Sequence, residues 1–330
     1  MDCLILADGS RVDSSKVIGN GADGFVIRYD YEDHVLKIPN LLGHLHPSGD
    51  IEAHVDNELY YDSLENEKQV YKRLQNVAGV AECLECSKNG IRLRYYPNGS
   101  LHELISRYGP PSMCWRWRWA LQATEVIARC HERGVLVLDI ALRNFLLTED
   151  FNLRIVDFAN SWLISPEEDI TKVNVHGGTA SLDMLYLSTV IFSILTWQDY
   201  STDCSDESNW PSSDTMPDLT GLTFGPVIQK CWLKEYTCIQ DFARELQCAA
   251  PPTKSLDHRT LVFASTEVNV RSSLSGSPPG SSQLKNTKNA HPWTDLFAWW
   301  TLVKPVVAGG LRSFCRWLAL CAAELSRLAW

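Results

Sequence analysis

The sequence predicts an α+β protein, with a β-rich N-terminal region followed by a mainly helical C-terminal region. Short runs of apolar and β-branched residues, bounded by Gly, Asn and Asp, occupy much of roughly the first hundred residues and are typical of strands. Longer segments with apolar residues three or four positions apart follow at 112–133 and 184–196, and this spacing indicates helices. A chain of 330 residues, 45% of them hydrophobic, is long enough for two lobes or domains.

Charge is unevenly distributed along the chain. Residues 251–330 hold nine Lys or Arg and four Asp or Glu, a net charge of +5, so residues 1–250 carry −15 within an overall net charge of −10. An acidic body with a basic end argues against nucleic acid as the main partner of the body.

The cysteines and the apolar runs indicate the compartment. Eleven cysteines, an odd number, are scattered through the chain, and the N-terminal stretch lacks the basic start and long apolar run of a secretory signal. We therefore expect an intracellular, cytoplasmic protein. No segment has 18 uninterrupted apolar residues, so no conventional transmembrane helix is expected. Cys83 and Cys86 form a C-x-x-C pair, but no second pair stands at zinc-ligand spacing, so no metal or redox role is assigned.

Three strands are expected near the N-terminus, at 12–17, 25–29 and 34–38. Residues 19–24, which read GNGADG, match G-x-G-x-x-G, a pattern whose glycines let backbone N–H groups approach phosphate oxygens closely. A dinucleotide-binding fold needs a helix immediately after the glycines, whereas the residues that follow here are β-type. The third strand carries Lys37 between apolar neighbours, and a buried amine needs a counter-charge.

A connector, a helix and a hairpin are expected next. Residues 40–60 form a long connector to which we assign no site. An apolar stripe at helical spacing predicts a helix at about 63–75. The segments 83–86 and 91–95 are interpreted as a hairpin, and the Pro-Asn-Gly-Ser sequence at 97–100 predicts a turn.

A long helix is expected at 112–133, with Ser112 as its N-cap and Gly134 as its stop signal. Three tryptophans near its start lie two residues apart. Because neighbours on one helix face are three or four residues apart, we expect that these side chains cannot all face inward. They are Trp115, Trp117 and Trp119.

The centre of the chain brings polar residues to one rim. The apolar runs 145–147 and 153–156 flank a turn, and a hairpin of this kind brings its two outer ends together. Asp139 and Asn144 are therefore expected at the same rim as Asp157. Two carboxylates and an amide supply oxygen ligands that suit Mg²⁺, and they leave a carboxylate able to accept a proton.

In their order and spacing, these motifs resemble those of protein kinases, whose patterns include G-x-G-x-x-G-x-V, H-R-D-x-x-x-x-N and D-F-G. The resemblance covers about residues 10–250. It implies a protein-kinase-like two-lobed fold with a β-rich N-lobe, residues 1–96, and a mainly helical C-lobe, residues 97–250. In this family an Asp at the start of a helix braces the catalytic loop, and Asp183 is interpreted in that way.

The resemblance implies a site that binds ATP and Mg²⁺. Lys37 would pair with Glu67 of the helix at 63–75, with Glu65 as the alternative partner, and position the α- and β-phosphates. The implied catalytic residues are Asp139, as the base, with Lys37 and Glu67. The implied metal ligands are Asn144 and Asp157. The implied cofactor-binding residues are Gly19, Gly21, Gly24, Val26, Lys37, Leu93 at the back of the pocket, and Tyr95 and Tyr96 in the hinge between the lobes.

The implied activity is transfer of the ATP γ-phosphate to a hydroxyl group of a protein substrate. Ser/Thr is the default, while Ala141 and Arg143 resemble the D-x-A-x-R-N loop of tyrosine kinases, so specificity stays open. The chain departs from the family at Val137, Leu138 and Ala159, and no A-P-E motif follows. These departures favour an alternative, a pseudokinase that acts as an ATP-binding scaffold. A small-molecule kinase of related fold is the second alternative.

Two further segments follow the kinase-like region. Residues 251–290 are rich in Ser, Pro and Gly and are expected to be a disordered linker. Residues 291–330 form a tail with five of the 12 Trp, and 311–330 treated as a helix gathers its polar residues in one arc. This pattern indicates an amphipathic helix at a membrane surface, and hence peripheral membrane association. A helix docked on the body or on a partner, and a mistaken gene model, remain as alternatives.

Overall fold

The computed structural model describes residues 2–251, except 22–23, 30–31, 54–56 and 203, together with the paired strands β13 (Val262–Phe263) and β14 (Thr266–Glu267). The chain divides into two units, Met1–Val270 and Arg271–Trp330. The second unit lies outside the described residues, and so do the helix expected at 311–330 and most of the expected linker.

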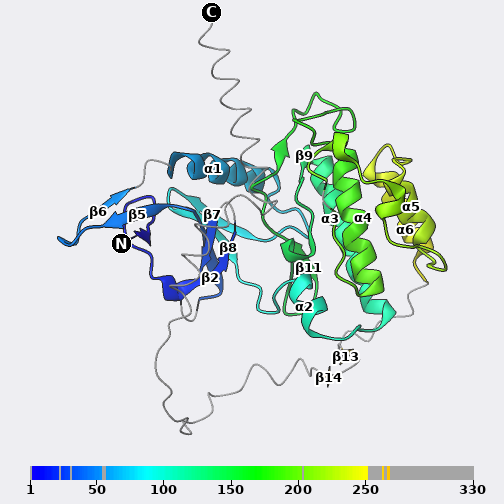
Figure 1. Ribbon diagram of the computed structural model, residues 1–330, viewed down its shortest axis with the longest axis horizontal. Coiled ribbons are helices and arrows are strands. Elements are labelled where there is room, and N and C mark those ends of the chain that lie inside the picture. The colour runs from blue at the N-terminus through cyan, green and yellow to red at the C-terminus, as the bar shows by residue number, and fades with distance from the viewer. Residues whose placement is uncertain are drawn as a thin grey trace, which may run out of the picture. The chain divides into compact units, whose positions relative to one another are not determined.

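A five-stranded antiparallel sheet forms the larger part of the N-terminal region, in the order β2-β3-β4-β8-β7. Helix α1 (Glu58–Arg73) lies along one face of this sheet (Figure 1). A strand was expected at 12–17, but the observed strand begins at Val17, because residues 14–16 form a short 3₁₀ helix, η1 (Ser14–Lys16). The strands are β2 (Val17–Asn20), β3 (Gly24–Ile27), β4 (His34–Pro39), β7 (Cys83–Ser87) and β8 (Gly90–Arg94).

The alternation of side chains along β4 places Lys37. Leu36 and Ile38 belong to a small apolar cluster with Ile27 on one side of the sheet. Successive side chains of a strand point to opposite faces, so Val35 and Lys37 point to the other side. There Val35 joins the main core, which continues into the helical region.

The connector expected at 40–60 forms a second, three-stranded sheet. Its strands β5 (Leu42–Leu45) and β6 (Ile51–Ala53) make a hairpin, and β5 also pairs with β1 (Asp2–Leu4) at the N-terminus. Asn57 fixes the end of this segment, since its side-chain oxygen accepts from the N–H of Leu42 at 3.0 Å and its amide donates to the C=O of Leu42 at 2.9 Å.

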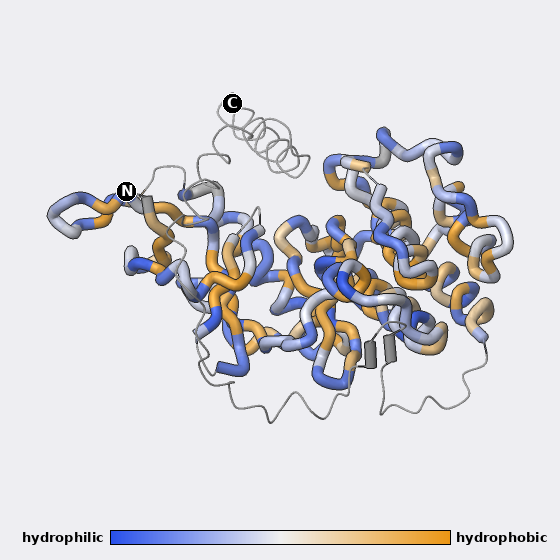
Figure 2. The backbone as a smooth tube through the Cα atoms, turned by 60° about the horizontal axis from the view of Figure 1, so that its bottom comes forward, coloured by the Kyte–Doolittle hydropathy of each residue, from blue (hydrophilic) through white to orange (hydrophobic). Residues whose placement is uncertain are grey.

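Helices dominate the C-terminal region. The long helices α3 and α4 lie side by side, with α5 and α6 packed beside them (Figure 1). Helix α4 is apolar around most of its circumference and nearly all of its residues are buried, as a helix of that kind must be to be stable in water. In Figure 2 the hydrophobic segments (orange) gather in the interior of the described part, and hydrophilic segments (blue) lie toward its outside. The helices are α2 (Leu101–Arg107), α3 (Met113–Glu132), α4 (Ala180–Thr196), α5 (Gly225–Trp232) and α6 (Ile239–Ala249).

The expectation that the three tryptophans of α3 could not all face inward is wrong. Trp115, Trp117 and Trp119 are all buried. The helix is covered on two sides: Trp115 packs edge-on against Phe151, whereas Trp117 packs edge-on against Phe224. Spacing alone excludes three buried side chains only for a helix that has a single covered face.

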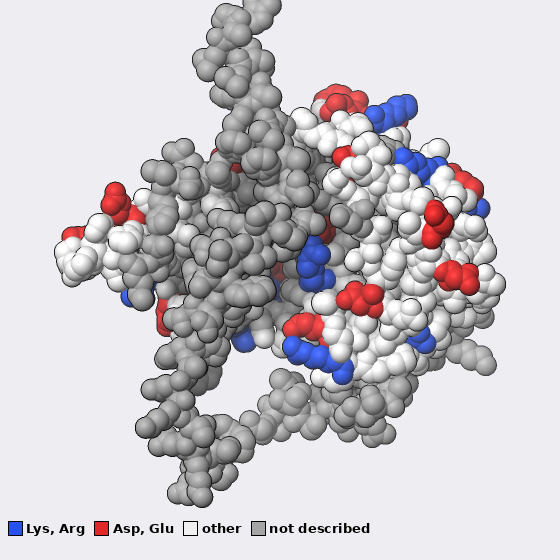
Figure 3. Space-filling view, in the orientation of Figure 1, with Lys and Arg blue, Asp and Glu red and all other residues white. Residues whose placement is uncertain are grey.

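Short elements complete the fold: β9 (Val135–Leu136), η3 (Leu142–Asn144), β10 (Phe145–Leu147), β11 (Leu153–Ile155), β12 (Trp162–Leu163), η4 (Glu207–Asn209) and η5 (Ser213–Thr215). Among the residues that the structure describes, no helix combines the length and apolar character needed to cross a membrane. On the face shown in Figure 3, acidic and basic side chains are interspersed over the described surface.

Candidate functional site

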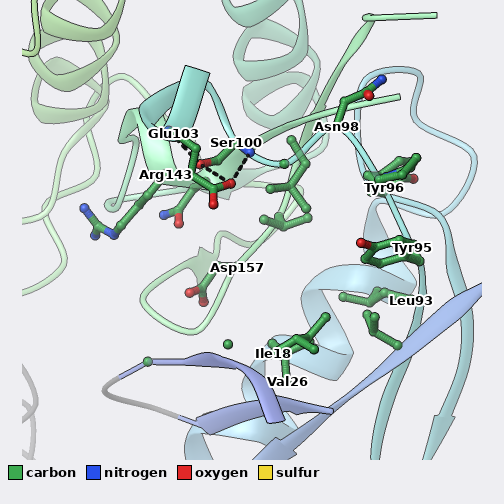
Figure 4. A pocket seen from close by; sticks show the side chains of 18 of the residues that line it. Ile18, Val26, Leu93, Tyr95, Tyr96, Asn98, Ser100, Glu103, Arg143 and Asp157 are labelled. Carbon is green, nitrogen blue, oxygen red and sulfur yellow. Dashed lines mark hydrogen bonds between the residues drawn. The ribbon is translucent and has the colours of Figure 1, made fainter. Parts of the chain in front are cut away.

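A cavity of about 800 Å³ lies where the five-stranded sheet meets the helical region. Figure 4 shows it from close by, with Ile18 and Val26 on the side of the sheet and Ser100, Glu103 and Arg143 on the side of the helices. Every predicted cofactor-binding residue and both predicted metal ligands line this cavity; they are Gly19, Gly21, Gly24, Val26, Lys37, Leu93, Tyr95, Tyr96, Asn144 and Asp157. Glu67 and Asp139 do not line it.

Lys37 stands between two carboxylates at the inner end of the cavity. Its Nζ lies 2.7 Å from Oε2 of Glu67 and 2.7 Å from Oδ1 of Asp157. The side chains of Lys37 and Glu67 are 8% and 1% exposed, so this contact is screened from water. The alternative partner, Glu65, is mostly exposed and pairs with Lys68 of its own helix instead.

Burial and charge act against each other in these three groups. Burial alone would lower the pKa of Lys37, but the carboxylates of Asp157 and Glu67 outweigh it and hold that pKa above its ordinary value. Burial alone would raise the pKa of Asp157, but Lys37 outweighs it and holds that pKa below its ordinary value. Burial raises the pKa of Glu67, and Lys37 opposes only part of that rise.

Glu67 also fixes the segment that carries Asp157. Its second oxygen accepts from the N–H of Phe158 at 3.2 Å. Phe158 is fully buried, and its ring meets that of Tyr71 of α1 edge-on at 5.1 Å. Helix α1, strand β4 and the Asp157 segment are thereby joined at one point.

The central hairpin brings its ends together, as its sequence predicts. Strands β10 and β11 pair from Phe145 opposite Ile155, and beyond them the N–H of Val156 donates to the C=O of Asn144 at 2.9 Å. Asn144 and Asp157 therefore reach the same rim of the cavity. Oδ1 of Asn144 and Oδ2 of Asp157 have no hydrogen-bond partner within the described part of the chain, so both oxygens are available to a cation.

Asp139 is held in the loop between β9 and β10. Its backbone C=O accepts from the side-chain amide of Asn144 at 2.9 Å. Its carboxylate accepts from one nitrogen of Arg143, at 2.6 and 2.8 Å to the two oxygens. The side chain of Arg143 is 61% exposed, and this residue, not Asp139, lines the cavity. This contact was not predicted, because Asp139 lies in a loop whose 3₁₀ turn begins only at Leu142, so no helical spacing marks the two side chains as neighbours.

Asp183 anchors the start of the same loop. It is fully buried, and its carboxylate accepts from the N–H of Val137 at 2.8 Å and from the N–H of Leu138 at 2.7 Å. His131 lies 2.8 Å from the same carboxylate. Asp183 thus lies beneath the loop that carries Asp139, at the position where the sequence argument expected it.

The helix at the mouth of the cavity, α2, was not predicted from the sequence. Helix α2 begins with a capping box: Ser100 accepts from the N–H of Glu103 at 3.2 Å, and Glu103 accepts from the N–H of Ser100 at 2.9 Å (Figure 4). Both residues line the cavity. The signal was available, because Ser-Leu-His-Glu has the S-x-x-E spacing of this motif.

Several curated protein kinases match the chain at low identity. A serine/threonine-protein kinase-like protein of Arabidopsis thaliana is 27% identical over 161 residues, covering 45% of this chain and 46% of the relative. 3-phosphoinositide-dependent protein kinase 1 of Homo sapiens is 30% identical over 89 residues, 27% of this chain and 16% of the relative. Mitogen-activated protein kinase kinase kinase 19 of Mus musculus is 30% identical over 105 residues, 31% of this chain and 8% of the relative.

The chain spans less than half the length of each of these relatives. No family model matches it. The matches support a kinase-like domain, and the β-rich N-terminal region followed by helices is compatible with that fold. The roles of the individual site residues stay predictions.

Proposed function

We propose that this chain binds ATP with Mg²⁺ in the cavity and transfers the γ-phosphate to a hydroxyl group of a protein. The observation that carries the proposal is the contact of the buried Lys37 with Glu67 and Asp157 at the inner end of the cavity. It holds an ammonium group and a carboxylate within one site, and phosphoryl transfer requires such groups around the phosphates and their metal ions.

The lining of the cavity fits an adenine ring. Val26, Val35 and Leu93 provide apolar surface on the side of the sheet. The backbone N–H of Tyr96, a residue that lines the cavity, has no acceptor among the described residues, so it is available to a nitrogen of the base. Burying a flat heterocycle between apolar side chains, with a few hydrogen bonds to fix its orientation, is the usual arrangement of small-ligand sites.

The polar end fits the phosphates and their cation. Asn144 Oδ1 and Asp157 Oδ2 would hold Mg²⁺, which prefers such oxygens and neutralises charge on the phosphates when it is bound. Lys37 would contact the α- and β-phosphates. Only Gly24 of the three glycines is required by packing, because a Cβ there would lie 2.2 Å from the C=O of Ile38. A Cβ on Gly21 would make only ordinary contact, at 3.5 Å, and one on Gly19 would lie 3.3 Å from the side chain of Val26.

Asp139 is the proposed acceptor of the hydroxyl proton. Its carboxylate is held by Arg143, whose mostly exposed side chain can move away when a substrate enters. Ser and Thr are the first choice of acceptor, because a relative named a serine/threonine-protein kinase-like protein matches the chain. Tyr remains the second, on the resemblance of Ala141 and Arg143 to the tyrosine-kinase loop.

The ion pair between Asp139 and Arg143 favours a second candidate function, an ATP-binding scaffold without catalysis. Arg143 occupies both oxygens of Asp139, so a substrate hydroxyl could approach only after this ion pair opens. The two candidates share the nucleotide site and differ only in transfer. A binding measurement and a transfer measurement therefore separate them.

Binding is tested by thermal melting with and without millimolar Mg·ATP. A ligand that binds only the folded state stabilises it, by about 2.7 kcal/mol at a concentration of 100 Kd. Lys37→Met and Asp157→Ala should each lose most of this gain. Lys72→Met on the exposed side of α1 is the matched control and should keep it. Absence of a gain in the wild type would refute both candidate functions.

Transfer is tested with radiolabelled ATP and generic Ser/Thr and Tyr substrates, comparing the wild type with Asp139→Asn. Incorporation that Asp139→Asn abolishes supports the kinase. Nucleotide-dependent stabilisation without incorporation assigns the chain to the scaffold function instead.

A further inference from the structure

Leu138, next to Asp139, has a backbone conformation that is unusual for its type. Its φ is +58°, in the left-handed region that a leucine rarely adopts. The hydrogen bond that its N–H donates to Asp183 holds the backbone in this conformation. The residue is buried, with 8% of its surface exposed. Conformations of this kind persist only where surrounding contacts fix them.

The side chain of Leu138 meets the backbone of Gly178. A Cβ on Gly178 would lie 2.6 Å from Cδ1 and 3.1 Å from Cδ2 of Leu138, so both methyl groups lie against this glycine. Gly178 ends a tight turn in which it exchanges two backbone hydrogen bonds of 2.9 Å with Val175. Its φ is not in the left-handed region, so the small size of this glycine is needed only for close approach.

The segment that ends in this turn is held by apolar contacts elsewhere too. Ile170, Val173 and Val175 pack against the main core. The ion pair of Lys172 with Asp169 is local, and the side chain of Lys172 is 82% exposed. The guanidinium of Arg73 donates to the C=O of Ile164 at 3.2 Å, so this contact comes from α1 and not from the loop that carries Asp139. Among the described residues, no Lys or Arg ion pair joins residues 160–178 to the loop that carries Asp139.

Two hydroxyl groups at the ends of this segment are used for structure. Ser161 is fully buried and donates to the C=O of Val137 at 3.0 Å. Thr179 is buried and caps α4 by accepting from the N–H of Leu182. The contact of Ser161 therefore ties the start of the segment to the residue before Leu138, and the contact of Thr179 fixes the start of α4 directly after the segment.

We infer that Leu138 and Gly178 form an apolar clasp that fixes the segment 160–178 on the loop carrying Asp139, with Leu138 as a positioning residue for that loop. This contact is uncharged and requires no modification of the segment. The consequence for catalysis rests on the proposed function, whereas the clasp itself does not.

Hydrogen exchange followed by mass spectrometry tests the clasp on the full chain without nucleotide. Leu138→Asn suits a left-handed backbone but removes both methyl groups, so strain is relieved while the contact is lost. Exchange of residues 170–178 should rise at least about tenfold, the scale expected for lost buried methyl groups. Leu138→Met should restore protection, and Lys172→Ala, which alters only an exposed pair, should not change it.

A pair of complementary substitutions tests the contact between Leu138 and Gly178 directly. Gly178→Ala places a methyl group against Leu138 and should also raise exchange of 170–178. Adding Leu138→Ala removes the nearer obstacle and leaves the C=O of Val175 at 3.1 Å, so the double variant should exchange more slowly than Gly178→Ala alone. Unchanged exchange in Leu138→Asn, or losses in the double variant that simply add, would overturn the clasp. Unchanged exchange of α3 peptides serves as the test that the variants are folded.

Steady-state kinetics test the positioning role. Leu138→Asn should lower kcat at least about tenfold and leave KM for ATP nearly unchanged, because Leu138 does not line the cavity. Leu138→Met should recover kcat. An unchanged kcat, or a raised KM at constant kcat, would overturn this role. Failure of nucleotide binding would instead refute the proposed function and leave the exchange result standing.

Discussion

Lys37→Met is the substitution whose effect the structure defines most sharply. Methionine keeps the length and the apolar stem of the lysine but removes its charge. Glu67, with 1% of its side chain exposed, then faces Asp157 without a cation between them. The variant therefore leaves a buried carboxylate unpaired, which costs much more free energy than loss of an exposed ion pair.

The magnitude follows from this burial. Removing one partner of a buried ion pair lowers the free energy of unfolding by about 3–5 kcal/mol. For a domain of this size, about 1 kcal/mol shifts Tm by about 2–4 °C, so we expect a loss of at least about 6 °C at neutral pH. Adding Glu67→Gln removes the unpaired charge. The double variant should therefore recover about half of the loss, and the double-mutant cycle measures this coupling.

The pH dependence has a defined sign. In Lys37→Met, burial and Asp157 both act to raise the pKa of Glu67, and the opposing Lys37 is gone. A carboxyl group whose pKa is higher in the folded state adds stability below its unfolded pKa, and this stability is lost as pH rises through the folded pKa. The deficit of Lys37→Met relative to wild type should therefore shrink between pH 8 and pH 5. Adding Glu67→Gln should remove the part of this pH dependence that comes from Glu67, while burial, no longer opposed by Lys37, still raises the pKa of Asp157.

Urea unfolding, followed by fluorescence at several pH values, measures these differences. Lys72→Met is the control for loss of a lysine on an exposed surface, and it should stay within about 0.5 kcal/mol of the wild type. A loss below about 1 kcal/mol for Lys37→Met, or one that grows as pH falls, would show that Glu67 and Lys37 are not a buried pair. The assignment of the inner end of the cavity would then be wrong.

Two further substitutions are predicted. Asp183→Ala leaves the buried N–H groups of Val137 and Leu138 without acceptors, so the free energy of unfolding, measured with urea, should fall by about 3–5 kcal/mol. A loss within about 1 kcal/mol, as expected of the exposed Asp169→Ala, would show that Asp183 does not support the loop. Gly24→Ala places a Cβ against the C=O of Ile38 and should lower the stability by about 1–3 kcal/mol, measured by thermal melting. Gly21→Ala, whose nearest contact is at 3.5 Å, should be tolerated. Equal losses of stability in the two variants would refute this packing.

Much of the site followed from local sequence patterns. The hairpin that brings Asn144 to Asp157 depends on two short apolar runs and the turn between them, all close together in the sequence. The position of Lys37 follows from the alternation of one strand. The pairing with Glu67 agreed with the family resemblance, and the geometry excludes Glu65, which points away to Lys68.

Features that depend on distant segments could not be predicted in this way. The sheet of the 40–60 connector needs β1, which lies 40 residues away in the sequence. The burial of Trp117 requires Phe224, more than a hundred residues further along the chain. Neither contact can be predicted from the local sequence. Apolar periodicity indicates that one face of an element is buried, but it does not indicate which distant segment covers that face or how many faces are covered.

The departures from the kinase patterns also acquire a different meaning in the structure. Val137, Leu138 and Ala159 are buried, and none of these three lines the cavity. Val137 donates to Asp183 and accepts from Ser161, and Leu138 packs on Gly178. Val137 and Leu138 therefore support the loop that carries Asp139, and none of the three replaced positions removes a group from the wall of the cavity. It follows that the question of catalysis rests on Asp139 itself, and above all on whether its ion pair with Arg143 opens when a substrate hydroxyl arrives.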